Sequence, residues 1–172
     1  MVILAQERAV PAPLPLQVAA ADGLRLAAEH QAGTGPGLLL AHGFGQTRQA
    51  WAGTQRRLAD AGRASLAWDL RGHGQSGRNP ADQPYRGEQF VDDVVLAAAA
   101  LGAAPVLVGA SMGGLTGLMA QARHRVFSAL VLVDITPRWE AAGVERILGF
   151  MNAHPDGFES FEHAAEQIAA YL

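Results

Sequence analysis

Short apolar runs alternate with helix-forming stretches through the middle of the chain. The runs are Leu38–Ala41, Ala64–Trp68, Pro105–Val108 and Ala129–Val133. Segments with helical spacing follow at 48–61, 88–101 and 112–123. Apolar runs this short and continuous are typical of strands buried on both faces of a parallel sheet, and parallel strands need crossover helices. The alternation predicts an α/β fold with a doubly wound, mostly parallel sheet.

A turn signal near the N-terminus predicts antiparallel pairing ahead of the parallel strands. Asp22-Gly23 separates two runs in which apolar and polar residues alternate, Leu16–Ala20 and Leu24–His30. An Asp-Gly pair between such runs is typical of a β-hairpin. The Gly-rich segment 32–37 is expected to end this hairpin.

Composition limits the classes of protein that the chain can belong to. With 172 residues, 49% of them hydrophobic, it can bury one sizeable core. The formal net charge is −3 and the basic residues are scattered, which argues against nucleic acid as a partner. There is no cysteine, so disulfides and thiol catalysis are excluded. We find no export signal and no apolar run near the roughly 20 residues that cross a bilayer, so a cytoplasmic protein without a membrane partner is expected.

Gly109-Ala-Ser-Met-Gly113 fits the pattern G-x-S-x-G, with an apolar run before it and a helix-forming run after it. A strained turn between strand and helix exposes a serine hydroxyl, and the flanking glycines allow a close backbone approach. The motif predicts that Ser111 is a nucleophile, with Gly109 and Gly113 in structural roles. Taken alone, the same letters fit an ordinary turn between strand and helix about equally well.

His42-Gly-Phe-Gly45 directly follows the first buried run. Acyl transfer needs backbone N–H groups that point at the oxyanion of a tetrahedral intermediate. Phe44 N–H and Met112 N–H are the expected donors. His42 and Gly43 are expected to support the loop, with the His42 side chain as a structural hydrogen-bonding group.

Asp69-Leu-Arg-Gly-His-Gly-Gln-Ser-Gly77 follows the second buried run and opens a long polar loop. In their order, the three motifs resemble the α/β-hydrolase superfamily, in its capped esterase, haloperoxidase-like and C–C-bond hydrolase branches. The resemblance covers the chain from about residue 16. It implies that Asp69, Arg71 and His73 order their loop, with a catalytic part for them as the minority interpretation.

The resemblance also implies a division of the chain. Residues 1–137 would form a partial hydrolase core, and 138–172 would begin a helical cap after Asp134-Ile-Thr-Pro137. The dehalogenase and epoxide-hydrolase branches of the family carry aspartate at the position of Ser111, so the serine argues against those chemistries. The implied activity is that of a serine hydrolase, which would cleave an ester-like acyl bond of a small apolar substrate through an acyl-enzyme.

The family order of catalytic residues is serine, acid, then histidine after the last strand. Asp134 is a candidate acid, and a polar residue that caps the turn into the cap is an equal alternative. His154 and His163 follow it, but a role as base for either is a minor interpretation, and His124 is expected to interact with the dipole of its helix. Since no strand follows Val133, we expect a hydrolase fold that lacks its last strands, truncated and weak or inactive alone.

Two further expectations concern partners. No H-x-x-x-H or H-E-x-x-H spacing is present, so no metal and no cofactor are predicted. An apolar edge strand at 129–133 would favour self-association or binding of a C-terminal complement.

The alternative to the enzyme is a non-catalytic hydrolase-fold binding module or pseudoenzyme, which would be favoured if the reading frame ended at Leu172.

Overall fold

The computed structural model describes residues 11–102, 104–138 and 140–171. It divides into two compact units, Met1–Thr136 (unit 1) and Pro137–Leu172 (unit 2). In the described residues, no helix combines the length and apolarity needed to span a bilayer. Each unit is described by itself.

Unit 1 is built on a six-stranded sheet with the order β1-β2-β4-β3-β5-β6. Its strands are β1 (Leu14–Ala19), β2 (Arg25–Gln31), β3 (Thr34–Ala41), β4 (Arg63–Trp68), β5 (Val106–Ala110) and β6 (Ala129–Val133). β1 and β2 form the antiparallel hairpin, and β2 pairs with β4 in antiparallel orientation. The four strands β4, β3, β5 and β6 are parallel to one another. The predicted α/β fold with an N-terminal hairpin and a mostly parallel sheet is confirmed.

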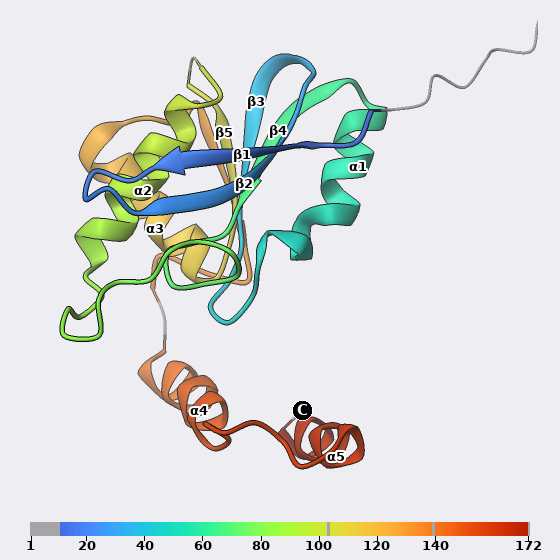
Figure 1. The fold of residues 1–172 in the computed structure, drawn as a ribbon, viewed down its shortest axis with the longest axis vertical. Coiled ribbons are helices and arrows are strands. Elements are labelled where there is room, and N and C mark those ends of the chain that lie inside the picture. Colours follow the sequence, from blue (N-terminus) through green and yellow to red (C-terminus); the bar gives the residue numbers. More distant parts are fainter. Residues whose placement is uncertain (1–10, 103, 139, 172) are drawn as a thin grey trace, which may run out of the picture. The chain divides into compact units, whose positions relative to one another are not determined.

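Helices cover both faces of this sheet (Figure 1). The connections contain η1 (Arg48–Trp51), α1 (Ala52–Asp60), α2 (Gly87–Ala99) and α3 (Met112–His124). Figure 1 shows α1 on one face and α2 with α3 on the other. In α2, Val91, Val94 and Ala98 recur at helical spacing and are buried, so an apolar stripe attaches the helix to the core.

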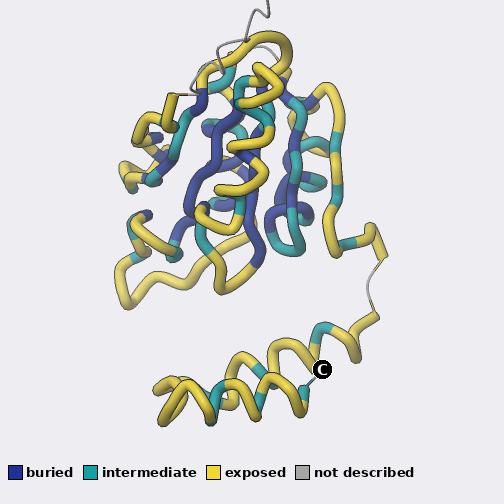
Figure 2. Tube along the Cα trace, turned by 90° about the vertical axis from the view of Figure 1, so that its right-hand side faces the viewer, coloured by how far each residue is buried: buried dark blue, intermediate teal, exposed yellow. Residues whose placement is uncertain are grey.

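The core lies along the central strands, which are the dark segments of Figure 2. Leu39, Leu66, Trp68 and Leu107 are fully buried and belong to one hydrophobic cluster. Strands β3, β4 and β5 have neighbours on both sides and helices over both faces, which is why their sequences are continuously apolar.

The Gly-rich segment after β2 differs from expectation, because it begins β3 instead of ending the hairpin. Thr34 pairs with Arg63, and after a register shift the pairing resumes at Leu38. A Cβ on Gly33 would lie 2.2 Å from the Ala64 nitrogen, so glycine is required for the chain to run this close to β4.

The strand register brings the chemically interesting segments to one edge of the sheet. Ala41 lies opposite Trp68 on one side and Gly109 on the other, and Gly109 lies opposite Leu132. The residues that follow β3, β4, β5 and β6 therefore leave the sheet together at its carboxyl edge. In open α/β sheets this edge is where ligands bind.

Unit 2 consists of α4 (Ala141–Asn152) and α5 (Phe161–Tyr171), and neither helix has a buried residue. The Phe150 and Tyr171 rings lie 4.5 Å apart, and the Arg146 guanidinium lies 4.8 Å from the Tyr171 ring centroid. These contacts join the two helices. The interpretation of unit 2 as the start of a cap stays a prediction.

Candidate active site

Ser111 occupies a strained turn between β5 and α3. Its φ of 44° and ψ of −113° are rare for a residue with a side chain. The Ser111 N–H donates to the Val133 carbonyl at 2.9 Å, and the Ser111 carbonyl accepts from Leu115 N–H at 2.9 Å. Both backbone groups are thus fixed, whereas the half-buried hydroxyl makes no hydrogen bond with the residues that the structure describes.

Glycines on both sides of Ser111 allow this turn to form. A Cβ on Gly109 would lie 2.6 Å from the Gly114 Cα, and a Cβ on Gly113 would lie 2.5 Å from the Ala41 carbonyl oxygen. Both contacts are with backbone atoms that the sheet and α3 hold in place. The motif therefore needs glycine here to let strand and helix approach.

The loop after β3 packs directly against the Ser111 turn. A Cβ on Gly43 would lie 3.5 Å from the Ser111 Cβ and 3.2 Å from Gln46 Oε1. Gln46 closes the loop, because its Oε1 accepts from Gly43 N–H at 3.0 Å and its N–H donates to the Gly43 carbonyl at 3.2 Å. Sequence reasoning missed Gln46, since a polar residue in a polar loop carries no distinguishing signal.

Two amides beside the turn have no hydrogen-bond acceptor within the described part of the chain. They are Phe44 N–H in the loop and Met112 N–H at the start of α3. The neighbouring Gly45 N–H is occupied, since it donates to His73 Nε2 at 3.2 Å. The two unoccupied amides are the expected oxyanion donors.

His42 is fully buried, and its neighbours satisfy both ring nitrogens. Nδ1 donates to the Gly43 carbonyl at 2.8 Å, and Nε2 accepts from Leu70 N–H at 3.0 Å. Burial lowers the pKa of His42, although the hydrogen bond to the Gly43 carbonyl opposes this effect. His42 is therefore a neutral link between the loops after β3 and β4, and its ring cannot accept a proton from Ser111 without breaking that link.

His73 connects the same two loops from the other side. Its Nδ1 donates to the Arg71 carbonyl at 3.1 Å, so Nε2 is the nitrogen that accepts from Gly45. The His73 ring packs edge-on against the His42 ring at 5.2 Å and against the Phe44 ring at 5.6 Å between centroids. Both nitrogens of this ring are also engaged.

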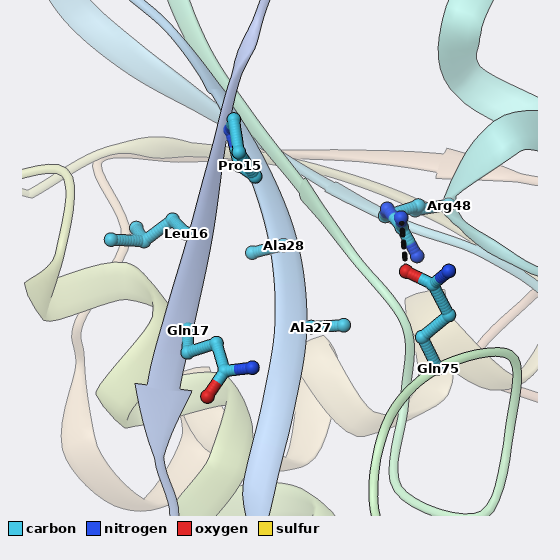
Figure 3. A pocket seen from close by; sticks show the side chains of 7 residues that line it. All are labelled: Pro15, Leu16, Gln17, Ala27, Ala28, Arg48 and Gln75. Carbon is cyan, nitrogen blue, oxygen red and sulfur yellow. Dashed lines mark hydrogen bonds between the residues drawn. The ribbon is translucent and has the colours of Figure 1, made fainter.

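Asp69 is fully buried and fixes the start of both loops. It accepts hydrogen bonds from Arg48 N–H at 2.7 Å and Gln75 N–H at 2.9 Å, and it pairs with the Arg48 guanidinium. Arg48 also donates to Glu29 at 3.1 Å. Its bond of 2.8 Å to the Gln75 side chain is the dashed line in Figure 3. A Cβ on Gly74 would lie 2.3 Å from Asp69 Oδ2, so the motif glycine makes room for the carboxylate.

Arg71 is buried and binds Asp93 of α2 through two hydrogen bonds of 2.6 and 2.7 Å. It also reaches Asp22 at 2.8 Å and Asn79 at 3.2 Å. The hydrogen bond from Arg71 lowers the pKa of Asp22, and the two carboxylates raise the pKa of Arg71. Burial raises the pKa of Asp93, although the guanidinium opposes this effect.

A hollow of about 170 Å³ lies beside the hairpin. Its lining residues are Pro15, Leu16, Gln17, Ala27, Ala28, Arg48 and Gln75 (Figure 3). The Arg48 nitrogens Nε, Nη1 and Nη2 are already bonded to Glu29, Asp69 and Gln75. The hollow therefore offers no unpaired cation to an anionic ligand, and its lining includes no residue of the Ser111 turn.

The remaining candidates from the sequence are Asp134, His124, His154 and His163. Asp134 directly follows Val133, whose carbonyl binds Ser111 N–H, and it has a φ of 52°. His124 is the last residue of α3, at the opposite end of that helix from Ser111. His154 and His163 lie in unit 2, with ring centroids 5.5 Å apart. Among the described residues no group of three or more side chains is arranged to hold a metal ion.

Comparison with known proteins agrees with the fold. Residues 36–168 match the model of the alpha/beta hydrolase fold family. An esterase of Mycobacterium tuberculosis is 34% identical over 136 residues, which are 77% of this chain and 44% of that protein. Protein phosphatase methylesterase 1 of Mus musculus is 31% identical, with 77% of this chain and 36% of that protein covered. An epoxide hydrolase of Caballeronia sordidicola is 32% identical, with 88% of this chain and 47% of that protein covered.

Comparison with solved structures also finds alpha/beta hydrolases. An alpha/beta hydrolase from Novosphingobium aromaticivorans superposes with a TM-score of 0.74 at 27% identity, with 83% of this chain and 51% of that one covered. The chain spans less than half the length of the curated relatives named above. The family match covers most of both units, and the serine turn and the three motifs lie within it, whereas the β1–β2 hairpin precedes it. The chain belongs to the alpha/beta hydrolase fold family.

Proposed function

We propose that the chain carries the nucleophile of a serine hydrolase that cleaves an ester-like acyl bond. The single observation that carries this proposal is that the Ser111 turn packs against the loop of Phe44, while the Ser111 hydroxyl, Phe44 N–H and Met112 N–H have no hydrogen-bond partner among the described residues. Preorganised donors of this kind usually make the largest single contribution to catalysis in such enzymes.

The proposed reaction follows from this geometry. Ser111 Oγ attacks the acyl carbon, its proton passes to a base, and the carbonyl electrons move onto the oxygen held by the two amides. Collapse of this intermediate expels the alcohol and leaves an acyl group on Ser111, which water then removes. Phe44 is 49% exposed beside its own amide, which favours a small substrate with an apolar acyl part.

Asp134 is our proposed acid, because the Val133 carbonyl ties the start of its segment to the Ser111 turn. The alternative role, a polar residue that caps the turn into unit 2, explains its positive φ equally well. The base is proposed to come from outside the described part of unit 1, because His42 and His73, the histidines of the loops after β3 and β4, have both ring nitrogens engaged. His30 lies within β2, and His124 is at the far end of α3 from Ser111. The same observation favours the second candidate function, a binding module or pseudoenzyme with a hydrolase fold.

Labelling with a fluorophosphonate tests the proposal on the protein expressed from its complete reading frame. The serine oxygen displaces fluoride from phosphorus, so we expect one adduct on Ser111 that is lost in Ser111→Ala. Ser128→Ala is the matched control, because Ser128 is exposed and its hydroxyl reaches the Pro105 carbonyl instead. Labelling that is unaffected by Ser111→Ala, or a folded protein that never labels, would overturn the nucleophile and favour the binding module.

The reaction type is tested separately with a panel of short-chain p-nitrophenyl esters and a small epoxide. We expect turnover of the esters and none of the epoxide, because a serine ester intermediate is the natural product of this site. Opening of the epoxide at a comparable rate would contradict the ester assignment, even if Ser111 labels.

A further inference from the structure

We propose that His73 is a positioning residue of the oxyanion loop, and that its ring must be neutral and bare at Nε2 to do this. The inference rests on the proposed function, because it concerns how the Phe44 amide is kept available for the oxyanion. His73 comes from the loop after β4, whereas Phe44 comes from the loop after β3.

The peptide group on one side of Phe44 is held by its carbonyl. The Gly43 carbonyl accepts from His42 Nδ1 at 2.8 Å and from Gln46 N–H at 3.2 Å. The Gly43 carbonyl and the Phe44 N–H belong to the same planar trans peptide, so the N–H points away from these two donors. Carbonyl bonds also polarise the peptide and make its N–H a stronger donor.

The peptide group on the other side of Phe44 is held by His73. Gly45 N–H donates to His73 Nε2 at 3.2 Å, and Gly45 has a φ of 72°. Without this bond the second peptide could rotate, and Phe44 would be fixed on one side alone. The His73 ring also packs against the Phe44 ring at 5.6 Å, so one side chain restrains both the backbone and the side chain of Phe44.

The tautomer of His73 follows from its second hydrogen bond. Nδ1 lies 3.1 Å from the Arg71 carbonyl, which can only accept, so Nδ1 carries the proton. Nε2 then has the lone pair that Gly45 N–H needs. Arg71 is itself fixed by Asp93 of α2, so the position of His73 is set by the sheet and helix rather than by the loop alone.

Kinetics of fluorophosphonate labelling test the inference, because the phosphonyl oxygen must enter the same oxyanion site. In His73→Met, which lacks the acceptor, we expect the maximal labelling rate to fall about 10- to 100-fold, less than the roughly 10²–10³-fold caused by loss of a whole donor. The concentration for half-maximal labelling should change little. His73→Gln retains an acceptor near the position of Nε2 and should recover most of the rate, and His124→Met is the control.

A wild-type rate in His73→Met would overturn the inference, and so would a His73→Gln variant as slow as His73→Met, because shape alone would then explain the loss. NMR of the wild-type protein gives a readout that does not need a reactive serine, with Nδ1 of His73 protonated and Nε2 bare. If Ser111 fails to label, the proposed function fails, while a protonated Nε2 would refute the role of His73 on its own.

Discussion

His42 lies fully buried between the loops that follow β3 and β4, with Nδ1 donating and Nε2 accepting. Only the neutral ring can make both bonds, and burial lowers its pKa in the folded protein below the value of about 6.5 in an unfolded chain. Between these two values the unfolded state binds more protons than the folded state. The contribution of His42 to stability is therefore complete above about pH 6.5 and is lost as the pH falls through the lowered pKa.

The loss of stability at low pH can be measured by comparing the wild type with His42→Gln. The glutamine offers an acceptor to Leu70 N–H at every pH. As the pH falls below about 6.5, the free energy of unfolding should decrease more steeply in the wild type than in the variant. The two slopes should differ by up to about 1.4 kcal/mol per pH unit. Urea unfolding at a series of pH values gives both slopes. Parallel slopes would show that His42 is not held neutral in the fold.

At the scale of elements, one guanidinium joins the hairpin turn, the long loop and α2. Arg71 binds Asp93, Asp22 and Asn79, and both Arg71 and Asp93 are buried. Asp93→Asn keeps the volume of the side chain and leaves the buried guanidinium without its main counter-charge. We expect a loss of about 3–5 kcal/mol in the free energy of unfolding.

The matched control for this change is Asp92→Asn on the exposed side of the same helix turn. Denaturant unfolding should show an effect within about 0.5 kcal/mol for that variant, as is usual for surface positions. Equal stabilities of the two variants would mean that the Arg71–Asp93 pair does not hold the elements together.

The elements themselves could be predicted from the sequence because their signals are local. β6 was predicted with its observed bounds, and α3 with a difference of one residue, since a continuous apolar run and helical spacing need no partner to be recognised. Arg48 and Asp93 were missed because their partners lie about twenty residues away in sequence, and a charged residue in a helix usually indicates a solvated face. The early start of β3 was missed because glycines normally interrupt a strand. In this segment they instead allow the chain to approach β4 closely.

At the scale of the whole molecule, the two edges of the sheet differ in how well they resist further pairing. β1 carries Pro15, which removes a backbone donor from that edge. β6 is a run of alanine, leucine and valine with a strand neighbour on one side among the described residues, and Val131 and Val133 are 47% and 40% exposed. We propose that two copies of this chain associate through β6, because a strand edge with unpaired backbone groups and apolar side chains favours pairing with another such edge.

Val131→Lys tests this, because a charged side chain on an edge strand opposes pairing with a second edge. We expect light scattering coupled to size exclusion to find less dimer or larger species in the variant than in the wild-type chain at equal concentration. Leu14→Lys adds the same charge to β1, where Leu14 is 68% exposed, and should leave the association unchanged because Pro15 already protects that edge. If the wild-type chain elutes as a sharp monomer and melts cooperatively, or if both lysine variants reduce association equally, the β6 edge is not the contact.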